Sequence, residues 1–152
     1  MPFVLKKENV RLIILGDGPL KESLQNVIED LDLNSHVELL GYVNNPLKYY
    51  KKADVFVLSS HVEGLPNVLV EAMMCGCTPV STDCPTGPRE VLEGGKYGYL
   101  VPMKNSKSLA QGIIQALKTP ISEDLLNEAV QPFEENKVLE AHTKALKLTM
   151  LL

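Results

Sequence analysis

The segment Asp54-Val55-Phe56-Val57-Leu58-Ser59-Ser60 is followed by a loop, by Asn67-Val68-Leu69-Val70-Glu71-Ala72-Met73-Met74-Cys75, and by Thr78-Pro79-Val80-Ser81. The first and last segments contain short, nearly continuous apolar runs, which is the pattern of strands buried on both faces of a parallel sheet. The middle segment predicts a helix that Asn67 caps and Gly76 ends. A strand, a crossover helix and a second strand make one βαβ unit.

The same alternation continues on both sides of this unit. Strands are expected over residues 10–15, 37–40 and 98–101, and helices over 20–33, 47–53, 89–92, 106–117, 123–129 and 134–148, with Ser106 as a cap. The fold class is therefore α/β, a Rossmann-like doubly wound parallel sheet with helices on both faces. In the helix over 20–33 one buried stripe is predicted from apolar spacings of three and four. Its members are Leu20, Leu24, Val27, Ile28 and Leu31.

Length and composition are those of one globular domain over residues 1–152, without an internal repeat or low-complexity linker. The net charge is -4, and the lysines are scattered or interleaved with acids, so broad nucleic-acid binding is excluded. No apolar run approaches the roughly 20 residues that a transmembrane helix needs. The segment Met1-Pro2-Phe3-Val4-Leu5-Lys6-Lys7 at the start is too short for a signal-peptide core. We therefore expect a cytoplasmic protein without a transmembrane segment.

The three cysteines, Cys75, Cys77 and Cys84, are an odd number in a chain without a secretory signal, which disfavours a disulfide framework. The Cys75-Gly76-Cys77 pattern admits a metal interpretation. No second Cys or His cluster at ligand spacing accompanies it, however. The favoured interpretation is that these are small buried apolar side chains near a helix-to-strand turn.

Ligands of such sheets bind beyond the carboxyl ends of the strands. Here those ends are the loops over residues 16–19, 41–45, 59–66 and 83–88. This edge of the sheet is the predicted site before any motif is considered.

Two carboxylates stand out at this edge, because Glu63 lies in a loop before a helix and Glu71 lies about one turn into it. Gly64 lets backbone approach a ligand, and the free amides at the start of the helix favour a phosphate or a polarised hydroxyl. Paired carboxylates suit vicinal hydroxyls, as in a sugar or a ribose. An exposed loop carboxylate is the plain alternative for Glu63. A solvated helix residue is the alternative for Glu71, although its neighbours in the helix are apolar and favour a bound partner.

A wider series of motifs resembles one family. It comprises Gly16-Asp17-Gly18-Pro19, Gly41-Tyr42-Val43, Ala53-Asp54-Val55-Phe56-Val57-Leu58-Ser59, Glu63 with seven residues before Glu71, Ala72-Met73, and Gly98-Tyr99-Leu100-Val101. In order and spacing this series resembles the carboxy-terminal, donor-binding domain of retaining GT-B glycosyltransferases of family 4. The resemblance covers about residues 10–117, with a helical tail over 118–152.

The resemblance implies roles for individual residues. Glu71 would hold the ribose hydroxyls of the nucleotide, and Glu63 would be the catalytic residue at the transferred sugar. The backbone of Gly64, Leu65 and Pro66 would contact sugar and phosphate. Tyr42 and Val43 would flank the base, and Gly16 and Gly18 would let their loop approach the donor. Enzymes of this family generally need no metal, and no cofactor besides the nucleotide-sugar substrate is expected.

Two further residues at this edge are weaker candidates. Arg89, next to the loop over 83–88, could supply phosphate charge, but a surface pairing with Glu90 or Glu93 is the favoured alternative. His61, two residues before Glu63, could touch the sugar, whereas a lone loop histidine is more often only exposed.

The resemblance also predicts what lies outside the motifs. Similar domains begin with an earlier strand and a loop whose Arg and Lys clamp the diphosphate, and they follow an amino-terminal acceptor domain; neither is expected in this chain. The predicted function is the donor half of an enzyme that transfers a hexose or N-acetylhexosamine, with retention, to an envelope glycan or lipid-linked acceptor. The full-length enzyme could lie peripherally at the inner membrane face. A non-catalytic nucleotide-binding or interaction remnant is the alternative, and an epimerase or phosphorylase of the same fold is a third option.

Overall fold

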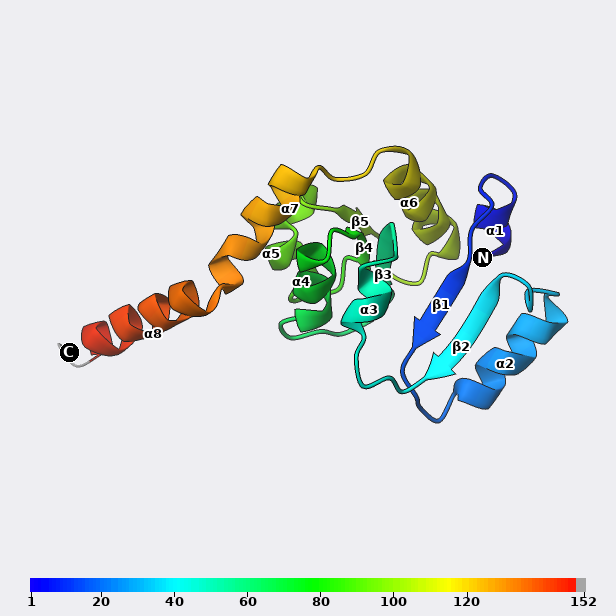
Figure 1. Cartoon of the computed structure of the whole chain (residues 1–152), viewed down its shortest axis with the longest axis horizontal. Helices are drawn as coiled ribbons and strands as arrows, with labels where there is room; N and C mark the ends of the chain where they lie inside the picture. Colours follow the sequence, from blue (N-terminus) through cyan, green and yellow to red (C-terminus); the bar gives the residue numbers. More distant parts are fainter. Residues whose placement is uncertain (150–152) are drawn as a thin grey trace.

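The computed structural model describes the backbone of residues 1–149 and the side chains of residues 1–144. The helices are α1 (Pro2–Leu5), α2 (Lys21–Asp30), α3 (Leu47–Tyr50), α4 (Asn67–Met74), α5 (Pro88–Val91), α6 (Ser106–Lys118), α7 (Glu123–Val130) and α8 (Glu135–Thr149). The strands are β1 (Leu12–Leu15), β2 (Val37–Gly41), β3 (Val55–Leu58), β4 (Thr78–Thr82) and β5 (Tyr99–Val101). Strands and helices alternate along the chain (Figure 1). The end of the helix predicted over 134–148 has no described side chains beyond residue 144.

All described strand pairs are parallel, and they form two sheets, β1–β2 and β3–β4–β5. The predicted α/β class with parallel strands and flanking helices is confirmed. The division of the strands into two sheets was not predicted, because strand pairing depends on contacts that a local pattern does not contain. Figure 1 draws β1 between β2 and β3.

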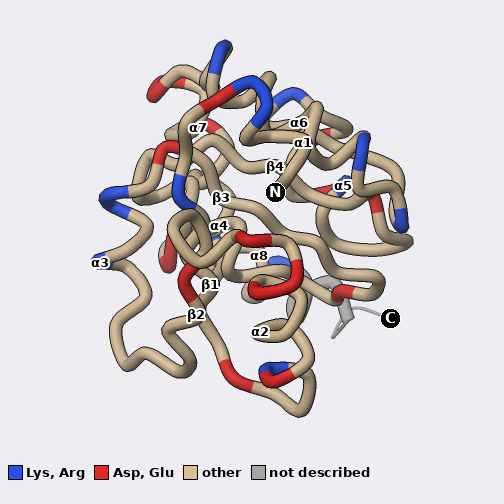
Figure 2. Tube along the Cα trace, turned by 90° about the vertical axis from the view of Figure 1, so that its right-hand side faces the viewer, with Lys and Arg blue, Asp and Glu red and all other residues tan. Residues whose placement is uncertain are grey.

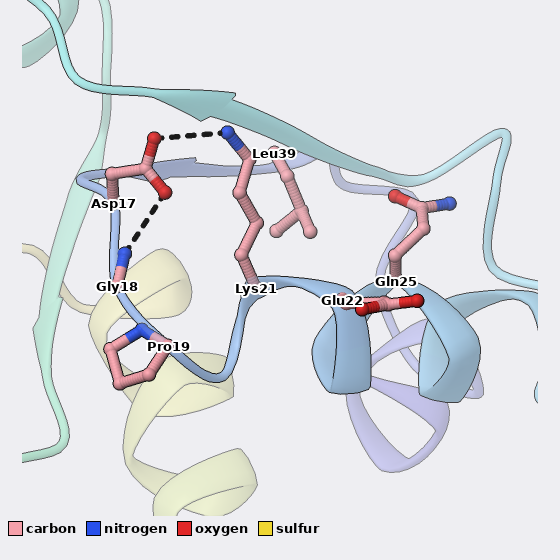
Figure 3. Close-up of a pocket in the computed structure, with 7 residues that line it drawn as sticks. All are labelled: Asp17, Gly18, Pro19, Lys21, Glu22, Gln25 and Leu39. Carbon is pink, nitrogen blue, oxygen red and sulfur yellow. Dashed lines mark hydrogen bonds and ion pairs between the residues drawn. The ribbon is translucent and has the colours of Figure 1, made fainter.

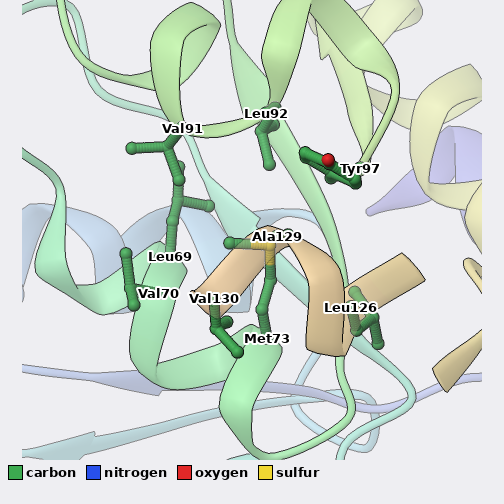
Figure 4. Close-up of a cluster of buried hydrophobic side chains, with 9 residues drawn as sticks. All are labelled: Leu69, Val70, Met73, Val91, Leu92, Tyr97, Leu126, Ala129 and Val130. Carbon is green, nitrogen blue, oxygen red and sulfur yellow. The ribbon is translucent and has the colours of Figure 1, made fainter. Parts of the chain in front are cut away.

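Helices cover both faces of the β3–β4–β5 sheet. On one face Phe56, Leu58 and Leu100 pack against α4 and α7. On the other face Val55, Val80 and Val101 pack against α6. The first of these clusters is drawn in Figure 4, where Met73 of α4 points toward Ala129 of α7 and Leu69 of α4 points toward Val91 of α5. Leu69 and Met73 are each at most 2% exposed, and the burial of each side chain contributes about 1.5 to 3 kcal/mol.

The β1–β2 sheet is covered by α2 and α1 on a single face. Leu12 and Ile14 of β1 pack there with Ile28 of α2, and Leu5 of α1 joins the same cluster. Ile13, whose side chain points to the opposite face, is 42% exposed. This sheet is therefore packed on one face only.

The buried stripe predicted for α2 is wrong for four of its five residues. Only Ile28 is buried, whereas Leu20, Leu24, Val27 and Leu31 are 44% to 68% exposed. Periodicity identified the helix correctly. It could not show that the described chain provides no second surface to cover the stripe.

Two predicted helix caps are also wrong. The N-cap of α4 is Pro66, and Asn67 is already the first helical residue. The N-cap of α6 is Asn105, whose side chain accepts a hydrogen bond of 2.9 Å from the amide of Ser108. Gly76 does follow the end of α4, with φ of +87°.

Figure 2 shows that residues of both charge signs are interspersed along the described chain. None of the described helices combines the length and the apolar character that crossing a membrane requires.

Candidate functional site

The loops predicted to form the site all follow the carboxyl ends of parallel strands. Leu15 at the end of β1 is the register partner of Gly41 at the end of β2, so the loops after these strands start side by side. Leu15 packs against the buried cluster of Tyr50, Ala72 and Cys77, and Phe56 of β3 packs against the same cluster. The end of β1 therefore lies near helix α4.

The loop after β1 is held by its own polar groups. The amide of Gly16 donates a hydrogen bond of 2.8 Å to the carbonyl of Gly41, and both glycines have positive φ angles, +115° and +71°. The Asp17 carboxylate accepts bonds from the amide of Gly18 at 2.9 Å and from Nζ of Lys21 at 3.2 Å. The hydrogen bond from Lys21, followed by that from Gly18, lowers the pKa of Asp17.

An open depression of about 500 Å³ adjoins this loop (Figure 3). Its lining residues are Asp17, Gly18, Pro19, Lys21, Glu22, Gln25 and Leu39. It includes Gly18 but neither Glu63 nor Glu71, so it covers only one part of the predicted site. Lys21 is a cation at this edge that the sequence analysis missed, although its spacing of four residues from Asp17 is the signal for such a pair.

The loop over residues 61–66 is held by hydrogen bonds from the end of β4 and from the loop that follows β4. The Thr86 hydroxyl donates to the carbonyl of Glu63, and the Thr82 hydroxyl donates to the carbonyl of Ser60. Gly87, with φ of +90°, approaches so closely that a Cβ there would lie 2.7 Å from Cδ of Pro66 and would collide with the carbonyl oxygen of Gly64. The backbone of Gly64 and Pro66 is thus held in place by loop contacts and not by a helix cap.

Glu63 and Glu71 are both half-buried. Within the described part of the chain, neither carboxylate forms a hydrogen bond or an ion pair with another side chain. Burial, and then the charge of Glu71, raise the pKa of Tyr50. Helix α4 is less enclosed than its sequence suggested, because Val68 and Met74 are 36% and 53% exposed.

Most of the remaining candidates are exposed. Tyr42 is 77% exposed, Val43 is half-buried, and His61, Gly64 and Leu65 are exposed, whereas Pro66 is buried. These residues line the same edge as Glu63 without making a closed pocket.

Arg89 forms an ion pair with Asp83. The surface pairing with Glu90 or Glu93 that the sequence favoured is not formed between the described side chains. Nε of Arg89 donates to Oδ1 of Asp83 at 3.0 Å, and a second guanidinium nitrogen bonds Oδ2 of the same side chain. Asp83 is the first residue after β4, so the Arg89 guanidinium does reach the predicted edge. Glu90 instead accepts a bond of 2.7 Å from the amide of Gly87.

The cysteines are all free thiols. Cys77 is fully buried, and its Sγ donates to the carbonyls of Tyr50 and Ala53 at 3.0 and 3.3 Å. Burial raises the pKa of Cys77 to about 11, with smaller contributions from Cys75 and Asp54. Among the described residues no group of three or more His, Cys, Asp or Glu side chains could hold a metal ion.

A family model described as "Glycosyl transferases group 1" matches residues 3–133, which is most of the chain. The chain belongs to this family. The match starts before the first predicted strand of this group 1 family member and includes α7.

Curated relatives agree with this assignment. The chain is 42% identical over 123 residues to an N-acetylgalactosaminyltransferase of Campylobacter jejuni that acts on N-acetylgalactosamine-N,N'-diacetylbacillosaminyl-diphospho-undecaprenol; the match covers 81% of this chain and 33% of that protein. It is 33% identical over 120 residues to a poly(ribitol-phosphate) alpha-N-acetylglucosaminyltransferase of Staphylococcus aureus, covering 78% of this chain and 24% of that one. The chain therefore spans about a third or less of these relatives.

Solved structures share the fold. A mutant of S. aureus TarM, in complex with Fondaparinux, alpha-GlcNAc-glycerol and UDP, superposes with a TM-score of 0.83 at 30% identity, over 96% of this chain and 30% of TarM. The Anabaena protein HepE in complex with UDP reaches 0.83 at 24% identity, over 95% of this chain and 43% of HepE, which supports the fold alone.

Proposed function

We propose that this group 1 chain is the donor-binding half of a retaining glycosyltransferase and that its ligand is a nucleotide diphosphate sugar. The observation that carries the proposal is the pair Glu63 and Glu71, half-buried at the carboxyl edge of β3 and without a described side-chain partner. A half-buried carboxylate without a protein side-chain partner keeps its acceptor sites available to a ligand that supplies hydrogen-bond donors. Vicinal hydroxyls of a ribose and of a hexose supply such donors.

The proposed roles follow the placement of each residue. Glu71 on α4 accepts hydrogen bonds from the ribose, and Glu63 in the preceding loop faces the transferred sugar. The backbone from Gly64 to Pro66, fixed from Gly87, contacts sugar and phosphate. Tyr42, with its exposed ring, stacks on the base, and Val43 supports it.

The loop of Gly16 and Gly18 approaches the diphosphate. Lys21 beside Asp17 and Arg89 beside Asp83 are the cations of the described chain that lie next to these loops. Both are already paired with a carboxylate, so we propose that the domain alone binds the diphosphate weakly. His61 is exposed, and the role proposed for it is a contact to the sugar.

The proposed donor is a hexose or N-acetylhexosamine carried by a nucleotide, and the acceptor is an envelope glycan or a lipid-linked saccharide. Two curated relatives support this class, because one transfers N-acetylgalactosamine to an undecaprenol-linked saccharide and the other N-acetylglucosamine to poly(ribitol-phosphate). TarM holds UDP, so uridine nucleotides are the first to test. We propose that the remaining part of a full-length enzyme binds the acceptor and that binding needs no metal.

The test is calorimetric titration of the chain with UDP, UDP-N-acetylglucosamine, UDP-N-acetylgalactosamine and UDP-glucose, with and without a metal chelator. We expect binding in the millimolar range that the chelator leaves unchanged. Glu71→Gln should weaken it about ten-fold, because a hydrogen bond to a charged group contributes about 1.5 to 3 kcal/mol.

Glu135→Gln, which removes the same charge from the first turn of α8, is the matched control and should change nothing. If Glu71→Gln binds as the parent does but unfolds more easily, Glu71 is a structural residue and the ribose role is wrong.

A further inference from the structure

Two consecutive carbonyls of the loop over residues 61–66, the site loop, are turned toward the loop that follows β4. The carbonyl oxygen of Glu63 accepts a hydrogen bond from the hydroxyl of Thr86. The carbonyl carbon of Gly64 lies 3.3 Å from the Cβ position of Gly87, and its oxygen is closer by almost the length of a C=O bond. The C=O bond of Gly64 therefore points at Gly87. Both carbonyls face residues 86 and 87.

The direction of these carbonyls sets the direction of the two amides that follow them. The peptide bonds of the described chain are trans, and a trans peptide group holds its C=O and its N–H on opposite sides of one plane. The N–H of Gly64 therefore points away from Thr86, and the N–H of Leu65 points away from Gly87. Two neighbouring amides thus point to the side of the site loop that is opposite the loop after β4.

Neither amide has a partner in the described part of the chain. The amides of Gly64 and Leu65 donate no hydrogen bond to a described residue, whereas the next amide along the chain, that of Asn67, is bonded to the carbonyl of Leu65 at 2.9 Å. Gly64 and Leu65 are also exposed. Successive backbone N–H groups in a turn form a concavity that binds anions. These two N–H groups therefore remain available to a ligand beside Glu63.

The anchor of this arrangement is the turn that starts α5. The amide of Gly87 donates to the carboxylate of Glu90 at 2.7 Å, and the carbonyl of Gly87 accepts from the amide of Val91 at 2.9 Å. Val91 is 4% exposed and belongs to the same core cluster as Leu69 of α4. Gly87 is therefore fixed relative to α4, the helix into which the site loop leads.

The side chain of Thr86 contributes to this arrangement through its hydroxyl and not through packing. Thr86 is exposed, so its side chain adds little to the core. Its hydroxyl reaches the carbonyl of Glu63 across 23 positions of the chain. A substitution at Thr86 can therefore remove the orienting hydrogen bond without opening a cavity.

We propose that Thr86 is a positioning residue for the nucleotide-sugar. Its hydroxyl, together with the backbone of Gly87, turns the peptide groups of the site loop so that the amides of Gly64 and Leu65 meet the diphosphate and the sugar. Thr86 itself does not touch the donor. This inference rests on the proposed function, because the two amides need this orientation only if a nucleotide-sugar lies against the site loop.

The first measurement needs no ligand. Residual dipolar couplings of the backbone N–H groups report their directions in the parent chain, in Thr86→Val and in Thr86→Ser. Valine keeps the shape of threonine without the hydroxyl, whereas serine keeps the hydroxyl. We expect the couplings of Gly64 and Leu65 to change in Thr86→Val, to match the parent in Thr86→Ser, and those of the core strands to stay the same in both. Unchanged couplings at Gly64 in Thr86→Val would overturn the proposal.

The second measurement titrates the same proteins with UDP-N-acetylglucosamine, UDP-N-acetylgalactosamine and UDP-glucose and follows the amide resonances. Thr86→Val should weaken binding by about three- to tenfold, because two hydrogen bonds to the donor lose their alignment, and Thr86→Ser should bind as the parent does. Thr143→Val is the matched control, since it removes a hydroxyl-to-carbonyl hydrogen bond of 2.8 Å on α8. This control should change neither the couplings of Gly64 nor the affinity.

The outcomes separate this inference from the proposed function. If the parent chain binds none of the three UDP-sugars, the proposed function fails and the positioning role fails with it. If the parent binds, and Thr86→Val has altered couplings at Gly64 but the affinity of the parent, the donor does not lie on these amides and the positioning role alone is overturned. Equal weakening by Thr86→Val and Thr86→Ser would show that the hydroxyl is not the group that matters, which also overturns it.

Discussion

At the scale of single residues, Gly87 holds the site loop through the absence of a side chain. A Cβ at this position would lie 2.7 Å from Cδ of Pro66, and φ is +90°. Gly87→Ala should therefore cost at least about 2 kcal/mol of unfolding free energy, through backbone strain together with displacement of the loop. Denaturant unfolding measures this loss.

Gly94→Ala is the matched control for this prediction. Gly94 also has a positive φ, +67°, but no atom lies within 4 Å of the Cβ position. Its substitution should show the strain alone, about 1 kcal/mol. Equal losses for the two variants would contradict the steric role of Gly87.

The Cys77 thiol gives this protein a predicted dependence on alkaline pH. Its pKa is about 11 in the folded chain against a usual value of 9.0, because the thiol is buried. The folded state therefore holds the proton more tightly than the unfolded state does. The stability from this group is fully present below pH 9.0 and is lost as the pH rises to about 11. The loss should be on the order of 2 kcal/mol.

Urea unfolding of the parent chain and of Cys77→Ser at several pH values between 9.0 and 11 checks this. Serine can still donate to the carbonyls of Tyr50 and Ala53 but does not titrate in this range. The variant should lack the part of the pH slope that belongs to Cys77. Parallel slopes in the two proteins would show that the thiol does not titrate with unfolding.

At the scale of the element, helices α4 and α6 begin in different ways. The side chain of Asn105 caps α6, whereas α4 follows Pro66 without a side-chain cap. Asn105→Ala should lower the unfolding free energy by about 1 kcal/mol, because the amide of Ser108 loses its partner. Ser106→Ala and Asn67→Ala, at the first helical residues, should each change it by less than about 0.5 kcal/mol. Thermal unfolding of the three variants separates these expectations; a loss at Ser106 as large as that at Asn105 would refute the assigned cap.

At the scale of the whole molecule, the chain by itself should not transfer sugar. It spans about a third of the length of its C. jejuni relative, and transfer requires an acceptor held against the anomeric carbon. Such positioning can account for about 7 to 11 kcal/mol of a barrier. We expect no product from the chain with UDP-sugars and undecaprenol-linked or polymeric acceptors, measured by mass spectrometry.

Joining the chain to the remaining domain of such a relative should restore transfer. Glu63→Ala in that fusion should then reduce turnover more than it weakens nucleotide binding. Efficient transfer by the 152-residue chain alone would overturn this expectation.

The sequence by itself determined most of the elements and the family of this protein, although it did not predict α1. The apolar runs of β1, β3 and β4 and the spacing of apolar residues in α4 and α6 are local patterns, and local patterns reflect the periods of strand and helix directly. The motifs around Glu63 and Glu71 were likewise read from spacing, and they led to the group 1 glycosyltransferases.

Only the tertiary structure decided which surfaces are covered and which groups meet. The stripe containing Leu24 is apolar whether or not another helix packs on it, so its exposure could not be read from the helix itself. The partner of Arg89 turned out to be Asp83, because the two lie at the ends of elements that packing brings together. The separation of β1 from β3 has the same origin: hydrogen bonds between strands depend on which chain segments are present to pair, and no single strand sequence contains that information.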